Sequence, residues 1–154
     1  MLRMSKLTDY GTAVMTYLAR ESGRLHTANE IAAGVHLAPP TASKILKALV
    51  HKGLVASHRG IKGGYTLARA AEDISVVQVI DAIEGPVGLT ECSNSPGVCA
   101  QEPHCSVRGN WQRISRTIRE ALAEVSLAEM AKPPVATHVV RFGKSPSPTP
   151  RAPA

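Results

Sequence analysis

The stretch TANEIAAGVHLAPPTASKILKALVHKG, residues 27–53, decides the fold that we expect. It opens with Thr27 and Glu30, the two members of a capping box, whose side chains satisfy free amides at a helix start. Pro39 begins a second apolar-periodic segment, and proline suits the first turn of a helix because its missing N–H group is no loss there. Gly53 follows that segment and is a favourable residue just past a helix end. The stretch therefore predicts two helices joined by a short turn, which is a helix-turn-helix.

The second of these helices, at about residues 39–52, has two different faces. Its apolar face consists of Ala42, Ile45, Leu46, Leu49 and Val50. Its other face carries short polar side chains, which suit base edges, and lysines, which suit phosphates. We expect four of these outward side chains to contact DNA: Thr41, Ser43, Lys44 and Lys47.

A glycine-rich segment, RGIKGG at residues 59–64, separates two short strand-like runs at 54–58 and 65–67. Such a segment predicts a β-hairpin, and the cations at its tip predict the wing of a winged helix. We expect Arg59 to enter the minor groove of DNA, whose narrow form attracts arginine. Lys62 is expected to meet a phosphate.

The distribution of charge supports a polyanionic partner. The chain has a net charge of +6, and between residues 38 and 69 it carries six Lys or Arg residues and no acid. Neutralising phosphates with such a surface releases condensed counterions and favours binding. Only 3% of the residues are aromatic against 44% apolar, so an aliphatic core of packed helices is expected. We expect a mainly α protein that binds double-stranded DNA and is not an enzyme.

Further helices are expected on both sides of this unit. One runs from about Thr8 to Glu21, and another follows Ser75 as far as Ile83. A long helix is expected from Arg108 to Val125, with apolar residues in alternating steps of three and four. Such a seam favours a partner helix, so we expect a homodimer, with packing on the same chain as the alternative. A last helical turn after Ser126 is expected to close the ordered chain.

These expectations divide the chain into four parts. The DNA-binding winged helix-turn-helix is assigned to residues 1–70, the linking helix and cysteine-rich loop to 71–107, the dimerisation helix to 108–131, and a disordered, basic, proline-rich tail to 132–154. No run of about 18 apolar residues is present, so no membrane span is expected. The first residues also lack the continuous apolar stretch of a signal peptide. We expect a cytoplasmic protein, in which cysteines stay reduced.

The three cysteines lie together in the segment between these helices. Six residues separate Cys92 from Cys99, and five separate Cys99 from Cys105. An odd, clustered set is a poor disulfide framework and a better metal site. Thiolates are the main ligands of iron–sulfur clusters. Structural zinc usually shows closer pairs, although His104 keeps a Cys₃His zinc site open.

Other readings of the cysteines remain open at this point. They include plain reduced thiols that sense oxidants, a thiol nucleophile of an enzyme, and a carrier of clusters. A thiol enzyme needs a base near the sulfur, and His104 is the only nearby histidine. A cluster carrier has no need of a basic helix and wing.

Three motifs resemble one family of regulators. They are LTDYG at residues 7–11, KGLV at 52–55 and HRGIKGGYTLA at 58–68. Together with the cysteine triplet they resemble the Rrf-type winged-helix transcription regulators, the family of the iron–sulfur sensor IscR and the nitric-oxide sensor NsrR. The resemblance covers about residues 1–131. The segments TEC at 90–92 and VRGNWQR at 107–113 most resemble the branch that regulates SUF-type cluster assembly genes.

The resemblance implies an iron–sulfur cluster, of the [2Fe–2S] type, held by Cys92, Cys99 and Cys105. IscR-like members carry a histidine three positions after the last cysteine, but this chain has Arg108 there, which cannot be a ligand. The fourth ligand is therefore open between two residues. His104 is one, and Asp9 is the other, supplied by the partner subunit, because NsrR-like members use an acidic residue in the matching motif.

Overall fold

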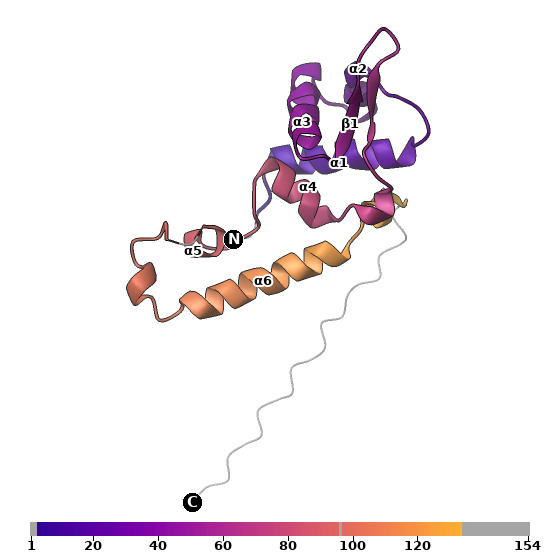
Figure 1. Ribbon diagram of the computed structural model, residues 1–154. Helices are drawn as coiled ribbons and strands as arrows, with labels where there is room; N and C mark the ends of the chain where they lie inside the picture. The colour runs from indigo at the N-terminus through magenta and orange to yellow at the C-terminus, as the bar shows by residue number, and fades with distance from the viewer. Residues whose placement is uncertain (1–2, 96, 134–154) are drawn as a thin grey trace, which may run out of the picture.

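The computed structural model describes residues 3–95 and 97–133 of the 154-residue chain. Its first half is a winged helix-turn-helix, and its second half is a cysteine-containing segment followed by a long helix (Figure 1). The α-helices are Lys6–Arg20 (α1), Ala28–Gly34 (α2), Pro39–His51 (α3), Val76–Ile83 (α4), Glu91–Asn94 (α5), Arg108–Glu124 (α6) and Leu127–Ala131 (α7). The strands are Val55–His58 (β1) and Gly64–Leu67 (β2), and two 3₁₀ turns occupy Ala71–Asp73 (η1) and Glu102–His104 (η2).

The mainly α fold expected from the sequence is confirmed. Aliphatic side chains from α1, α2, α3, α4 and β1 meet in one core, as the scarcity of aromatic residues suggested. The fully or almost fully buried members are Val14, Met15, Leu18, Ile31, Ile45, Leu46, Leu49, Leu54, Val55, Ile74, Val79 and Leu127. Helix α3 packs on α2 and β1 at this core, with its outer face left at the surface.

Helix α1 begins at Lys6, two residues before the start that its apolar pattern suggested. Ser5 is the reason, because its hydroxyl accepts a hydrogen bond from the Thr8 amide and so caps the helix. The carboxylate of Glu84, at the end of α4, accepts hydrogen bonds from the Ser5 amide and the Thr8 hydroxyl. Hydrogen bonding from the Ser5 side chain and then from the Thr8 hydroxyl, with a smaller part from the Ser5 amide, lowers the pKa of Glu84. The start of α1 and the end of α4 are thereby joined.

Gly11 lies at a second contact between α1 and α4. A Cβ atom there would lie 2.0 Å from Cδ1 of Ile83. A larger residue at position 11 would therefore force the end of the Ile83 side chain to move.

The end of the chain that the structure describes returns to the winged-helix half. After α6 the amide of Leu127 donates to the carbonyl of Ile74 at 2.7 Å, and the amide of Val76 donates to the carbonyl of Val125 at 2.9 Å. Leu127 is fully buried in the core, and α7 packs on α1. The long helix is therefore attached to the winged-helix body at its carboxyl end, while its other end lies beside α5 (Figure 1).

The segment from 87 to 106, in which the sequence shows no periodic pattern, contains two short helical pieces, α5 and η2. Both are about one turn long, too short for an apolar repeat to reveal. The expected proline-rich tail, residues 132–154, lies outside the described residues from position 134 onward. Within the described ranges, no helix combines the length and the apolar character needed to span a bilayer.

Candidate functional site

The recognition helix α3 presents the polar side chains that the sequence singled out. Lys44 and Lys47 are exposed, and Thr41 and Ser43 are half-buried at the edge of the same helix. The opposite face of α3 is buried in the core, as its apolar pattern predicted. The turn before α3 places His36 in the left-handed region, at φ 55°. The four expected contact residues therefore all reach the surface on one helix.

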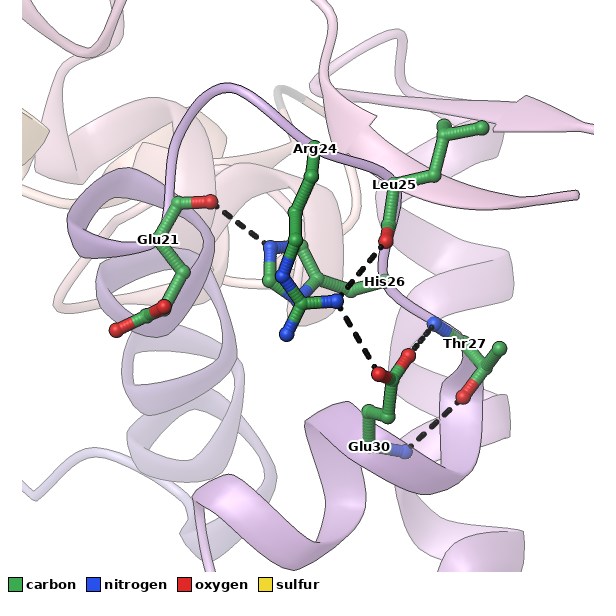
Figure 2. Close-up of polar contacts among 6 residues, drawn as sticks. All are labelled: Glu21, Arg24, Leu25, His26, Thr27 and Glu30. Carbon is green, nitrogen blue, oxygen red and sulfur yellow. Dashed lines mark hydrogen bonds and ion pairs between the residues drawn. The ribbon is translucent and has the colours of Figure 1, made fainter. Parts of the chain in front are cut away.

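The start of α2 is fixed by the capping box, as predicted (Figure 2). The Glu30 carboxylate accepts from the Thr27 amide at 2.7 Å and from the Arg24 guanidinium at 3.1 Å. These hydrogen bonds lower the pKa of Glu30 from 4.5 to about 2. Those from Thr27 contribute most, followed by the one from Arg24. The network sets where α2 begins, and hence the geometry of the helix-turn-helix.

The wing is tied to this same segment through the backbone. Strands β1 and β2 pair antiparallel with His58 opposite Gly64, and the amide of Tyr65 donates to the carbonyl of His26 at 2.8 Å. His26 is buried, and its Nε2 atom donates to the carbonyl of Glu21 at 2.8 Å (Figure 2). The hairpin therefore has a fixed base on the helix-turn-helix, although its tip projects freely.

The cations on this side of the molecule are available to a partner. Arg59 and Lys62 are exposed at the wing tip. Neither they nor Lys44 and Lys47 take part in any of the three ion pairs that the described residues form. A helix and a wing that carry unpaired cations can bind the phosphates of nucleic acid.

The three cysteines are free thiols in different local settings. Cys92 is buried in α5, and its sulfur lies 3.3 Å from the Thr90 hydroxyl, whereas Cys99 and Cys105 are half-buried. Among the residues that the structure describes, no group of three or more Cys, His, Asp or Glu side chains is placed to hold a metal ion. The expected ligands share one segment but are not gathered around one point. Three thiols suit an iron–sulfur cluster chemically, but binding one requires this segment to rearrange.

An ion pair that the sequence did not suggest holds the cysteine segment in its present shape. The Glu102 carboxylate, only 7% exposed, lies 2.6 Å from the Arg108 guanidinium and accepts from the Gly97 amide at 2.6 Å. The bond from Gly97 to Glu102 encloses Cys99, and the pair between Glu102 and Arg108 encloses Cys105. The two contacts of Glu102 together therefore close the segment around two of the three cysteines. Arg108, the departure from the IscR pattern, thus has a structural partner.

The two candidate fourth ligands are both exposed. Asp9 lies in the first turn of α1 and lines a cavity with Val76 and Met130, which no cysteine lines. His104 lies in η2, next to Cys105. Neither is brought together with the three thiols within the described part of the chain.

The cysteine segment is connected to the DNA-binding half through α6. Cys92 lines a small cavity together with Ser115 and Arg119 of α6. Ser115 is buried and accepts a hydrogen bond from the Leu89 amide at 3.1 Å. Arg119 donates to both carboxylate oxygens of Asp81 on α4, at 2.8 and 2.5 Å, and these bonds raise the pKa of Arg119. Sequence periodicity missed this pair because its members are 38 positions apart.

The expected apolar seam of α6 divides between two environments. Ile118 and Leu122 are half-buried and line a cavity with Ile80 of α4. Trp111 and Ile114 are 39% and 40% exposed. Packing on the same chain therefore accounts for the second half of the seam only.

A helix-turn-helix with a basic recognition helix and a basic wing defines a DNA-binding transcriptional regulator. The family model described as "Rrf2: Iron-dependent Transcriptional regulator" matches residues 4–133, and this chain belongs to the Rrf2 family. Several of its relatives are named as regulators, and it is a regulator rather than an enzyme.

Two curated relatives illustrate the range of similarity. An HTH-type transcriptional regulator of Mycobacterium tuberculosis is 30% identical over 142 residues, which cover 92% of this chain and 88% of the relative. The HTH-type transcriptional regulator IscR of Erwinia tasmaniensis is 37% identical over 87 residues, covering 56% of this chain and 52% of that one.

Solved structures share the fold over most of the chain. CymR, the global cysteine regulator of B. subtilis, superposes with a TM-score of 0.67 at 28% identity, covering 85% of this chain and 97% of CymR. IscR of T. potens gives a TM-score of 0.64 at 29% identity, covering 84% and 85%. An oxidized form of Staphylococcus aureus CymR gives 0.66 at 26% identity, covering 88% and 100%.

Proposed function

We propose that this regulator binds an iron–sulfur cluster, of the [2Fe–2S] type, through Cys92, Cys99 and Cys105, and that the cluster controls its binding to DNA. The observation that carries the proposal is the place of the three free thiols, in one segment between the winged-helix body and α6. Similarity to IscR proteins supports it. When bound, the cluster supplies chemistry that responds to oxidants and to cluster supply. The fourth ligand is Asp9 of the partner subunit or His104.

The chain's own contacts suggest how the segment acts on DNA binding. We expect gathering of the three thiols to open or shift the contacts of Glu102, because its bond from Gly97 encloses Cys99 and its pair with Arg108 encloses Cys105. Movement of the segment is also transmitted to α6 through the Leu89–Ser115 hydrogen bond. Since α6 is joined to α4 and to the core at Leu127, such a movement changes how the winged helix is held.

The proposed DNA contacts are Thr41, Ser43, Lys44 and Lys47 on α3 and Arg59 and Lys62 on the wing. A duplex selected from a random library by the unmodified protein is a suitable probe. Replacing Lys47 and Arg59 together by Ala should weaken binding and lower its dependence on salt, because fewer protein cations then displace counterions from the duplex. Arg116→Ala, on exposed α6, is the matched control. An unchanged salt slope in the double variant contradicts the proposed docking.

We further propose a homodimer formed through the exposed part of the α6 seam. Helix-turn-helix dimers hold their reading heads over half-sites about 34 Å apart. Trp111 and Ile114 leave an apolar strip on α6 that a second copy would cover. Ile114→Lys should produce monomers in sedimentation velocity, whereas Arg113→Lys should not. A variant at Ile114 that stays dimeric contradicts this assignment.

Anaerobic purification tests the cluster itself. The expected product is brown, with visible absorption, and contains iron and acid-labile sulfide. Cys92→Ala should lose the colour and keep a folded dimer, and Ser93→Ala is its control. Colourless protein that contains zinc would support a zinc-bound regulator. Colourless metal-free protein whose DNA binding changes on oxidation would support a thiol sensor.

The proposed targets are genes for SUF-type cluster assembly, on the basis of the motif resemblance. DNA from upstream of such genes is the probe, and unrelated intergenic DNA of the same length is the control. Equal affinity for the two, at the same salt concentration, contradicts this target.

A further inference from the structure

The tip of the wing carries an aliphatic side chain that the fold does not use. Ile61 has a relative exposure of 107%, higher than that of any other large apolar residue described. The remaining exposed apolar residues are Met4, Val98, Val107, Trp111, Ile114 and Met130, at 39–64%, and none of them lies on the hairpin. Ile61 therefore stands alone at the tip.

The backbone of the tip gives Ile61 a defined position. The Gly63 amide donates to the Gly60 carbonyl at 2.9 Å, which closes a tight turn around residues 61 and 62. Gly60 has φ 115°, a conformation that disfavours other residues. A Cβ atom on Gly63 would lie 2.2 Å from the His58 carbonyl oxygen. The side chain at 61 is thus presented outward by a turn that needs glycine on both sides.

The surroundings of Ile61 indicate the kind of partner that it meets. Arg59 and Lys62 flank it, and no acidic residue occurs between positions 38 and 69. A protein interface needs about 1,000 Å² of buried surface or more, which one isoleucine between cations does not supply. Contact in a DNA groove does not need so large a buried area, because a single Ile, Leu or Phe side chain inserted at a base step from the minor groove kinks the duplex.

We infer that Ile61 is an apolar wedge, which enters the minor groove beside Arg59 and bends the DNA. Arg59 supplies attraction to the groove, and Ile61 gains burial against sugars and base edges when it leaves water. The wedge adds indirect readout, because pyrimidine–purine steps kink more easily than others. It gives the protein sequence preference at positions that α3 does not reach. This inference rests on the DNA-binding function and names a specificity residue within it.

The test compares three variants on a duplex selected by the unmodified full-length protein. Ile61→Ser removes the wedge, Ile61→Met keeps an apolar side chain, and Lys62→Ala removes a neighbouring cation. The measurements are affinity over a range of salt concentrations, and the bend angle from energy transfer between dyes on the duplex ends. Both positions, 61 and 62, are exposed, so folding is unaffected.

Ile61→Ser should bind about tenfold more weakly, which is about 1.4 kcal/mol. It should bend the duplex less and keep the salt slope, since it removes no charge. Ile61→Met should behave like the unmodified protein. Lys62→Ala should lose about one unit of salt slope and keep the bend.

Several results would overturn the inference. One is an Ile61→Ser variant with unchanged affinity and bend, and another is an unmodified protein that leaves the duplex straight. Normal DNA binding with reduced transcription in a purified system would instead assign Ile61 to a contact with the polymerase. If the unmodified protein selects no duplex at all, the DNA-binding function itself fails, which is a distinguishable outcome.

Discussion

The Asp81–Arg119 pair should stabilise the attachment of α6 to the winged-helix body. It joins α4 to α6 by two hydrogen bonds between charged groups, at 2.8 and 2.5 Å. Replacing either residue, as Asp81→Asn or Arg119→Gln, removes the ion pair and leaves a polar side chain of similar size. We expect each single variant to unfold more easily than the unmodified protein.

The size of the effect follows from the exposure of the two side chains. Arg119 is 41% exposed and Asp81 is 27% exposed, so water screens part of their attraction. Fully exposed pairs contribute about 0.2–1 kcal/mol to the free energy of unfolding. A bidentate arginine–carboxylate contact lies at the strong end of that range. We therefore expect a coupling energy of about 1 kcal/mol between Asp81 and Arg119.

A double-mutant cycle in urea measures this coupling directly. The double variant should be about as stable as either single variant, because the interaction can be lost only once. Arg116→Gln is the matched control, since Arg116 is exposed on the same helix and takes part in none of the ion pairs described. Additive losses in the double variant would mean that the pair does not couple the two helices. The coupling should also weaken in 1 M salt.

Three more predictions concern other contacts. Leu127→Ala should lower the free energy of unfolding by about 2–5 kcal/mol, because Leu127 is fully buried, whereas Met130→Ala on the same short helix should cost much less; equal losses in urea unfolding would refute this. The ionised Glu30 side chain stabilises the fold above its unfolded pKa of 4.5, and this stabilisation is lost as the pH falls toward 2. Glu30→Gln should therefore flatten the dependence of the free energy of unfolding on pH between these values. An unchanged pH profile contradicts the assignment. Glu102→Gln weakens the bond to Arg108, so the thiols of the cysteine segment should react severalfold faster with a thiol reagent; equal rates would show that the pair does not hold the segment closed.

Local signals in the sequence were enough to predict most helix boundaries. The capping box at Thr27 and Glu30 and the equivalent one at Ser126 and Glu129 are both formed. They are reliable because the residues that satisfy one another are only three positions apart. The wing was predictable for the same reason, since its glycines lie next to the turn that requires them.

The contacts that hold the second half of the chain in place were not predictable in this way. Asp81 pairs with Arg119 and Leu89 with Ser115, across 38 and 26 positions. Ser115 is buried on α6 although it is polar, because its hydroxyl accepts the Leu89 amide. The apolar periodicity of the sequence does not reveal these long-range polar contacts.

The cysteine segment shows a further limit of sequence reasoning. The spacing of the thiols indicates what they can bind, but not where they lie when nothing is bound. A buried carboxylate, Glu102, shapes the segment, and acidic residues are normally expected at the surface. Its partner Arg108 was noticed only as a departure from a ligand pattern.

The link between the thiols and DNA binding is tested most directly by measuring operator affinity on one protein sample under anaerobic conditions. The measurement is made before iron and sulfide are removed, after their removal, and again after reconstitution. The account predicts that the dissociation constant changes on removal, returns on reconstitution, and stays constant in a variant with Ser at positions 92, 99 and 105. A sample that takes up iron and sulfide on these thiols yet binds its operator equally well in all three states would contradict it.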